Sequence, residues 1–374
     1  MGSESRGVGD RPSIPSNKLA DRTPATAPVH ASHGSPTTPP QQQQDSSQQV
    51  DGKWKLASGA ASRPEPDAAT RLMGKLSPVD KPNLVPASMI NLLWGTNNDM
   101  GMHHLGWHLM ARPDRDRWIS QLKQDPDFVK FNARTKWLDG MQKLKPLNEG
   151  SKGNGVAFGA MHRGMIEVLK NPKTYEARGL PVPEGLDKIF EGWKEIPTEG
   201  IAKVTPPDQQ PKVRKTLEML MNIETNWKQF NSLDELCNFM QTQVLSQLGV
   251  SGTHNILHVA MADGHSPIDV GDPMLNLYNK NFWGLHGFID NVISGYIKAR
   301  GKGAKGADAT ACKKELAEFN KVKKAQTEHM VHSLSPLPAK VGTKGPVAHG
   351  PVVPPPEIPL SLREVSKQMF QPPE

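Results

Sequence analysis

Two pairs of histidines, each pair four residues apart, constrain the fold of this chain more than any other feature. His104 and His108 lie in MHHLGWHLM, and His254 and His258 lie in GTHNILHVAM. Residues i and i+4 lie on one face of an α-helix, so each pair predicts a helix with two imidazoles one turn apart. One such pair alone is a weak signal, because histidines at this spacing more often have structural or surface roles than metal-binding ones.

A further histidine follows each pair, within an apolar segment. His162 lies in FGAMHRGMI and His286 lies in FWGLHGFID. A buried imidazole needs a partner, and a metal ion satisfies several imidazoles at once. The histidines therefore predict two adjacent metal ions with three imidazoles each. The two sets are His104, His108 and His162, and His254, His258 and His286.

The types of ligand indicate the metal. Imidazole-only ligation suits copper, zinc, iron or nickel, whereas carboxylates shift the choice towards iron or manganese. The acidic residues nearest to the histidines, Glu167, Asp263 and Asp290, lack the Glu-x-x-His spacing of di-iron carboxylate proteins. An all-histidine set therefore favours two copper ions. Asp290, four residues after His286, is interpreted as an acceptor that orients an imidazole or caps a neighbour.

The apolar spacing between the histidines is mostly helical, and strand signals are sparse. Helices are expected at 85–94, 102–111, 127–144, 155–170, 233–248, 253–264, 279–301 and 309–331. Ser232 and Glu235 have the spacing of a capping box, and Gly249 is expected to end the helix that they begin. We predict a mainly α chain with a four-helix bundle around a dinuclear copper core.

Composition divides the chain into three parts. Residues 1–82 are rich in Pro, Ser and Gln and poor in large apolar residues, so we expect a disordered arm. Residues 83–335 are expected to form the helical copper domain, since this length can bury one sizeable core. Residues 336–374 form a Pro-rich tail, which we interpret either as a lid over the site or as a linker.

The charge, the cysteines and the lack of long apolar runs indicate which partners and which location to expect. The net charge of +7 is spread along the chain without a basic stripe interleaved with aromatic residues, so nucleic-acid binding is not expected. The two cysteines, Cys237 and Cys312, offer no disulfide framework. No apolar run reaches the length of a membrane span, and the N-terminus lacks an apolar signal core. We expect a cytoplasmic protein without a membrane partner, with export by an unconventional route as the alternative.

Four blocks of the sequence resemble the type-3 copper superfamily of tyrosinases, hemocyanins and prophenoloxidases, and their style is closest to the arthropod hemocyanins and prophenoloxidases. They occur in the family's order within about 85–300. The blocks are MHHLGWHLMARP at 102–113, FGAMHRGMI at 158–166, LGVSGTHNILHVAMA at 248–262 and DPMLNLYNKNFWGLHGFIDNVI at 272–293. The resemblance implies the same six histidine ligands, two copper ions and O2 as a co-substrate.

The chain also departs from that family. The hemocyanins have a large β-sandwich domain and a separate N-terminal helical domain, and this sequence offers no counterpart of either. In the family, the N-terminal domain supplies a residue that blocks access to copper. The departure therefore implies an open site, which favours an enzyme over an oxygen carrier.

The resemblance implies an oxidase that uses O2 to convert a catechol, an o-aminophenol or a phenol into an o-quinone-type product. Asn255 matches a position that in tyrosinase-like enzymes helps to place a water that deprotonates phenols. That water also needs a Glu, and upstream this chain offers Gln243 and Gln247 instead. We therefore expect oxidation of catechols or o-aminophenols rather than hydroxylation of monophenols. The dry wall of the pocket is expected to consist of Trp107, Phe158, Phe282 and Trp283.

Two other functions stay open. One is a non-catalytic, hemocyanin-like protein that binds O2 or copper. The other is a helical interaction protein in which the arm carries the function and the histidines are structural. His103 and His265 are not expected to be ligands, and Arg163 is expected to form a structural ion pair.

Overall fold

The structure is a computed structural model that describes residues 49–50, 53–54, 68–95, 99–144, 147–242, 245–246, 249–250, 252–333 and 358–370. The chain divides into two compact units, residues 1–63 and 64–374. In the first unit, β1 (Gln49–Val50) pairs with β2 (Lys53–Trp54) in antiparallel register. Most of the expected N-terminal arm lies outside the described residues.

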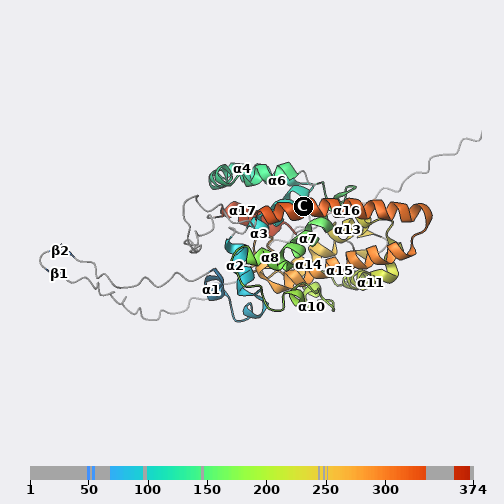
Figure 1. Cartoon of the computed structure of the whole chain (residues 1–374), viewed down its shortest axis with the longest axis horizontal. Coiled ribbons are helices and arrows are strands. Elements are labelled where there is room, and N and C mark those ends of the chain that lie inside the picture. Colours follow the sequence, from blue (N-terminus) through green and yellow to red (C-terminus); the bar gives the residue numbers. More distant parts are fainter. Residues whose placement is uncertain are drawn as a thin grey trace, which may run out of the picture. The chain divides into compact units, whose positions relative to one another are not determined.

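The second unit is almost entirely helical (Figure 1), which confirms the predicted mainly α class. Its α-helices are α1 (Ala68–Lys75), α2 (Ala87–Gly95), α3 (Asp99–Ala111), α4 (Arg115–Gln124), α5 (Pro126–Thr135), α6 (Trp137–Leu144), α7 (Asn154–Lys170), α8 (Pro172–Glu176), α9 (Leu186–Ile189), α10 (Thr198–Val204), α11 (Gln210–Met221), α12 (Ile223–Asn226), α13 (Leu233–Gln241), α14 (Thr253–Met261), α15 (Lys280–Gly303), α16 (Gly306–Ser333) and α17 (Leu360–Gln368). The short elements are the 3-10 helices η1 (Lys81–Asn83), η2 (Trp227–Gln229) and η3 (Asn276–Tyr278) and the antiparallel strands β3 (Leu245–Ser246) and β4 (Gly249–Val250).

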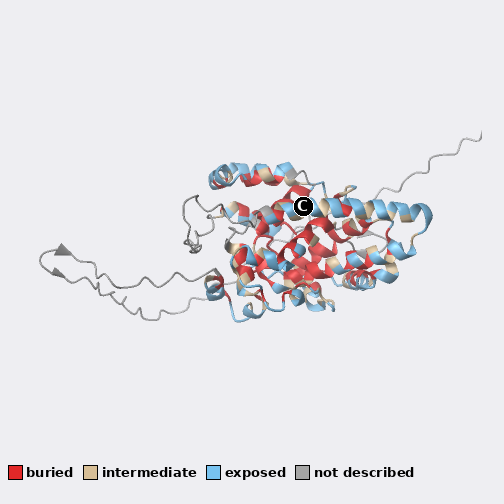
Figure 2. Ribbon diagram, viewed as in Figure 1, coloured by how far each residue is buried: buried red, intermediate tan, exposed pale blue. Residues whose placement is uncertain are grey.

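Helix α7 lies in the core of the second unit. Of its 17 residues, 13 are buried, as expected for a helix that is covered on all sides. Helices α13, α15 and α16 pack against it, and Figure 2 shows the buried residues concentrated in this central layer. A Cβ at Gly155 would lie 2.0 Å from the carbonyl oxygen of Asp234, so only glycine allows α13 to approach so closely. The helix that carries His162 therefore lies in close backbone contact with α13.

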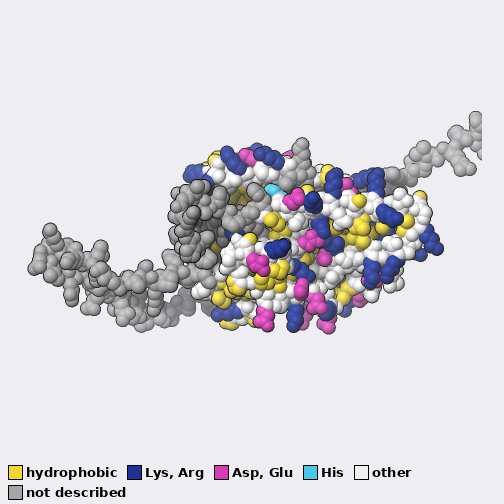
Figure 3. All heavy atoms as spheres, in the orientation of Figure 1, with side chains coloured by type: hydrophobic (Ala, Val, Ile, Leu, Met, Phe, Trp, Pro, Cys, Tyr) yellow, Lys and Arg dark blue, Asp and Glu magenta, His cyan; other side chains and the backbone are white. Residues whose placement is uncertain are grey.

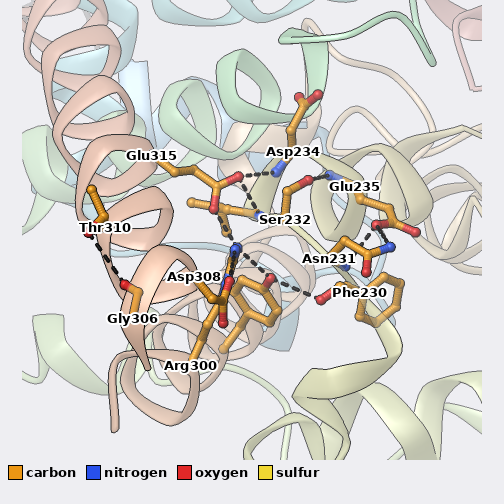
Figure 4. Close-up of polar contacts among 12 residues, drawn as sticks. Phe230, Asn231, Ser232, Asp234, Glu235, Arg300, Gly306, Asp308, Thr310 and Glu315 are labelled. Carbon is orange, nitrogen blue, oxygen red and sulfur yellow. Dashed lines mark hydrogen bonds and ion pairs between the residues drawn. The ribbon is translucent and has the colours of Figure 1, made fainter. Parts of the chain in front are cut away.

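A polar network, which we call the Arg300 network, joins α15 to α16 and to the start of α13 (Figure 4). The Arg300 guanidinium is buried and donates to Glu315 at 2.7 Å and to Asp308 at 3.1 Å. It also donates to the Tyr296 hydroxyl at 2.9 Å. The second oxygen of Glu315 accepts the Leu233 amide N–H at 2.7 Å, at the first turn of α13. Each charge in this network faces a group of the opposite charge or a hydrogen-bond partner.

The predicted cap of α13 is confirmed, but its predicted end is wrong. The Ser232 hydroxyl oxygen accepts the Glu235 amide N–H at 3.0 Å, as in a capping box. The helix ends at Gln241 rather than before Gly249. The buried Gln241 side chain accepts a hydrogen bond from Asn154 of α7 at 2.6 Å, so a tertiary contact outweighs the local helical pattern here.

The helix expected at 127–144 is two helices in the structure. Asp125 caps α5, and its carboxylate accepts the Asp127 amide N–H at 2.9 Å. Lys136 then adopts the left-handed conformation with φ 56°, and its N–H donates to the Asn132 carbonyl. This residue ends α5 and lets the chain turn into α6, because a left-handed residue is a common way to end a helix.

The expected boundary of the N-terminal arm at residue 82 is also wrong. From Ala68 the chain forms α1, which packs against α2. Ala69, Leu72 and Leu76 of this region are buried in the core. Their spacing of three and four residues gives α1 an apolar face, so this segment can offset its ordering entropy.

The surface of the second unit is of mixed charge. On the face that Figure 3 shows, Lys and Arg side chains are interspersed with Asp and Glu. Exposed ion pairs of this kind, such as Lys298 with Glu224 at 2.8 Å, contribute at most about 1 kcal/mol each. None of the helices in the described part of the chain combines the length and apolar character that crossing a bilayer requires.

Candidate metal centre

Four helices bring the six predicted histidines together in what we call the histidine cluster. Helix α3 contributes His104 and His108, α7 contributes His162, α14 contributes His254 and His258, and α15 contributes His286. Every one of these side chains is at most 1% exposed. The ring centroids of His162 and His286 are 4.5 Å apart, and those of His108 and His254 are 5.2 Å apart. Residues far apart in the sequence thus form one compact group.

The described residues contain three groups of ring nitrogens that lie close enough to hold a metal ion. The groups are His104, His162 and His286; His108, His162 and His254; and His254, His258 and His286. The last group is the predicted second set. The predicted first set is not one of the three, because His162 combines with histidines of both sets. In the structure the two predicted sets are therefore not separate, because histidines of both sets lie in the same groups.

Backbone carbonyls orient four of the six imidazoles. The contacts are His104 Nδ1 with Pro273 O at 3.3 Å, His162 Nδ1 with Phe158 O at 2.9 Å, His258 Nδ1 with Val270 O at 2.7 Å, and His286 Nδ1 with Phe282 O at 2.8 Å. A carbonyl oxygen only accepts hydrogen bonds, so each of these Nδ1 atoms carries the proton. The Nε2 atom of each ring then offers only a lone pair.

Several of these lone pairs converge without complementary donors, whereas His104 Nε2 has His108 Nε2 as a possible donor at 3.2 Å. The Nε2 atoms of His254 and His258 lie 3.1 Å apart, and each ring bonds through Nδ1 to an oxygen. Two neutral rings of this tautomer cannot share a hydrogen bond through Nε2. The Nε2 atoms of His162 and His286 are buried without a hydrogen-bond partner. Because an unpaired buried polar group is costly, the arrangement is suited to hold a cation between the rings.

Burial keeps the imidazoles neutral, which is the form that binds a metal. Desolvation lowers the pKa of His104 to about 3 and that of His254 to about 4. Desolvation also lowers the pKa of the other four rings well below the usual range, and the neighbouring imidazoles add to the effect. The cluster thus offers nitrogen donors only, in a dry site, and this donor set fits copper or zinc.

The predicted aromatic wall surrounds the cluster. Phe282 lies 3.9 Å from His286 and Phe158 lies 4.4 Å from His162, between ring centroids. Trp107 packs against His108 at 5.1 Å. Trp283 is farther away, at 6.5 Å from His286, and supports Phe282 from behind at 4.6 Å. All four aromatic side chains are at most 1% exposed.

Asn255 lies against His254. Its Oδ1 accepts a hydrogen bond from His254 Nδ1 at 2.7 Å, and its side chain is buried. Asn255 therefore orients His254, as groups behind metal ligands commonly do. Gln243 and Gln247, considered for the role of the missing Glu, lie outside the described residues.

Asp290 does not orient an imidazole, so that interpretation is wrong. Its carboxylate pairs with the Arg163 guanidinium, whose Nη2 also donates to the Asp290 carbonyl at 3.1 Å. The predicted structural ion pair of Arg163 is thereby confirmed. Backbone carbonyls and Asn255 already serve as acceptors for the rings, so the carboxylate is left to hold α15 against α7.

The two histidines not expected to be ligands lie outside the three groups. His103 is buried on another face of α3, where its ring is 5.0 Å from His329 of α16. His265 lies in an exposed turn, and its N–H donates to Asp263 at 2.9 Å.

Phe370 closes the cluster; it lies in the tail that was interpreted either as a lid or as a linker, although the ring itself was not singled out. Its ring stacks on His258 with the centroids 3.8 Å apart and the planes 8° apart. The expectation of an open site is therefore wrong. The signal was present in the tail, because Leu362, Val365 and Met369 have the spacing of an apolar helix face just before Phe370.

Comparisons of the chain with protein-family models, with curated proteins and with solved structures found no match.

Proposed function

We propose that this protein is a dinuclear type-3 copper oxidase that uses O2 to oxidise a catechol, an o-aminophenol or a phenol to an o-quinone-type product. The observation that carries the proposal is the convergence of buried, unprotonated Nε2 atoms from four helices. The order and content of the four copper-type sequence blocks support it independently. We further propose that α3, α7, α14 and α15 are the four-helix frame of the centre.

One copper ion would be held by His254, His258 and His286, which already form one of the three groups. The other would be held by His104, His108 and His162, which would have to move closer together to share an ion. Bound copper supplies the electron transfer between substrate and O2 that the protein's own side chains lack. The carbonyls behind the rings and Asn255 fix the tautomer and direction of the ligands. Phe158 and Phe282 exclude water from the site, which prevents side reactions of an oxidised product.

The alternative proposal is a non-catalytic protein that binds copper or O2. Phe370 favours it, because the ring covers the His258 face on which an aromatic substrate would lie. A purely structural role of the histidines is disfavoured, since structural imidazoles would have hydrogen-bond donors opposite Nε2.

Metal analysis of the full chain tests the proposal. After separate incubation with copper and with zinc, we expect about two copper ions per chain, as in other helical dinuclear sites. His258→Ala should lower this content, whereas His265→Ala, in the exposed turn, should not. The copper-loaded protein should consume O2 with a catechol or an o-aminophenol.

Two results would contradict the proposal. One is a copper content below about one per chain that His258→Ala does not change, because the cluster would then not be the binding site. The other is a firm preference for zinc with no O2 uptake on any substrate of the panel, which would exclude a redox function.

A further inference from the structure

A further pair of histidines, outside the histidine cluster, joins α3 to α16. His103 is the residue before His104 on α3, but its ring lies beside α16. The ring centroids of His103 and His329 are 5.0 Å apart, and the planes are tilted by 43°. Two ring pairs of the cluster have centroids 4.5 Å and 5.2 Å apart, so this pair is as closely spaced as rings within the cluster.

The His103 ring is buried without a polar partner. The residue is 3% exposed, and neither of its ring nitrogens has a hydrogen-bond partner among the described residues. A neutral imidazole offers one donor and one acceptor, so both are left unsatisfied here. Buried polar atoms without partners are uncommon in folded proteins, and they indicate an ion or a water molecule that the ring contacts.

Helix α16 supplies a third donor at the same place. Gln326 precedes His329 by three residues, so the two side chains lie on one face of the helix. Gln326 is close enough to His103 to affect the pKa of its ring, although no hydrogen bond joins the two side chains. The buried Gln326 Oε1 also lacks a partner among the described residues. Two imidazoles and one amide oxygen thus lie together where α16 meets α3.

The spacing of the two rings fits a shared metal ion better than a shared water molecule. With metal–nitrogen bonds of about 2.0 Å at a tetrahedral angle, two imidazoles on one ion have centroids about 5 Å apart. A water molecule would hold the centroids about 6.5 Å apart, because each N···O distance is about 2.8 Å. The observed distance is 5.0 Å. Burial lowers the pKa of His103 to about 3, so the ring is in the neutral form that binds a metal.

We propose that His103, Gln326 and His329 form a separate metal site, the α3–α16 site, which holds one copper or zinc ion. Imidazole nitrogens suit both metals, and one nitrogen of the half-buried His329 suffices for the ion while the other serves a different contact. His103 is then a ligand of this ion rather than of the cluster, which revises the expectation from the sequence. The ion ties α16 to the helix that carries His104 and His108. No substrate and no oxidase activity enter this proposal.

Residue-specific protection tests the α3–α16 site. The full chain is incubated with Zn²⁺ or, under reducing conditions, with Cu⁺ and is then treated with diethyl pyrocarbonate. Mass spectrometry follows the modification of each histidine. A bound ion occupies the reactive nitrogen, so we expect His329 to react about tenfold more slowly with at least one of the two ions. The exposed His265 is the internal reference, and a His329 rate that neither ion changes would overturn the site.

Three variants separate this site from the histidine cluster. His258→Ala damages the cluster and should leave the protection of His329 by metal intact. His329→Ala should lower the metal content by about one ion per chain, whereas His265→Ala should not change it. Circular dichroism checks that each variant keeps its helical content. Equal metal contents of the parent and of folded His329→Ala protein would overturn the site.

Substitutions of Gln326 test the third donor. Gln326→Glu replaces the amide by a carboxylate of the same shape, whose negative charge offsets that of the ion. We therefore expect about tenfold tighter binding, measured as the metal concentration that half-protects His329. Gln326→Leu offers no donor and should bind more weakly than the parent. The same half-protecting concentration in the parent and in both folded variants would overturn the three-residue site.

Discussion

The Arg300 network and the histidine cluster are two buried polar regions in the same helical unit, and they are built in opposite ways. In the Arg300 network, a guanidinium faces the carboxylates of Glu315 and Asp308, and the Tyr296 hydroxyl donates onward to the Phe230 carbonyl at 3.2 Å. Donors meet acceptors and charges meet opposite charges. The network is complete within the chain.

In the histidine cluster, acceptors face acceptors. Five of the six rings, all except His108, use their Nδ1 protons on oxygens behind them and direct their Nε2 lone pairs into the cluster. Buried polar groups that form hydrogen bonds with one another stabilise a fold. Buried polar groups that converge without hydrogen-bond partners are typical of a binding site for a ligand. This difference supports the proposal that the cluster is the metal site, and it fits a structural role for the Arg300 network.

The largest expected effect is the loss of metal from His162→Ala. His162 belongs to two of the three possible metal groups, and its loss leaves only the group of His254, His258 and His286 complete. A site worth roughly 10–16 kcal/mol shares that energy among its ligands, so we expect about a thousandfold weaker metal binding. Competition with a chelator measures the affinity. The metal-free variant should lose less stability than an ordinary cavity mutation, because removal of an unpaired buried atom offsets part of the cost of the cavity.

Arg300→Ala should lower the stability of the fold and leave metal affinity unchanged. It leaves the Glu315 carboxylate, whose side chain is 18% exposed, without its buried partner. We expect the free energy of unfolding to fall by about 3–4 kcal/mol, while metal affinity per folded chain stays the same. Urea unfolding and chelator competition give the two numbers. Lys298→Ala, in the exposed pair with Glu224, is the matched control and should cost less than about 1 kcal/mol.

Asp272 is an intermediate case, because its buried carboxylate is hydrogen-bonded but still strongly desolvated. Burial raises its pKa from 3.8 to about 6. The folded form then holds its proton more tightly than the unfolded form, so the free energy of unfolding falls as the pH rises from about 4 to 6. The total change is up to about 3 kcal/mol, and it is complete above that window.

Asp272→Asn keeps an acceptor oxygen and removes the ionisation. Compared with the parent, the variant should gain stability between pH 4 and pH 7 and gain nothing below pH 4. Urea unfolding at these two pH values checks the sign. If the stability of the variant falls with rising pH as steeply as that of the parent, a group other than Asp272 is responsible for the pH dependence.

The smallest expected effect concerns Asn255. Asn255→Ala removes the acceptor of His254 Nδ1, so the hydrogen bond no longer fixes the tautomer of that ring. Loss of such a group behind a ligand typically weakens metal binding about tenfold or somewhat more. Asn255→Asp retains the acceptor and should recover most of the affinity. Equal affinities for all three proteins would mean that the hydrogen bond does not orient the ligand.

Much of the fold could be predicted from the sequence, because helical spacing is a local property. The i, i+4 pairs predicted helices around His104 and His254, and the apolar pattern predicted the helix that carries His286. Where tertiary contacts compete with local pattern, the prediction failed. Gln241 ends α13 early, and Lys136 divides a predicted helix, in both cases against an otherwise continuous helical pattern.

The sequence by itself determined the helical class and the identity of the six convergent histidines, since both follow from spacing along the chain. Only the tertiary structure decided that His162 lies between the two sets, that loop carbonyls hold the rings, and that Asp290 pairs with Arg163. It also placed Phe370 on His258. These contacts join segments that are distant in sequence, and periodicity carries no information about which distant faces meet.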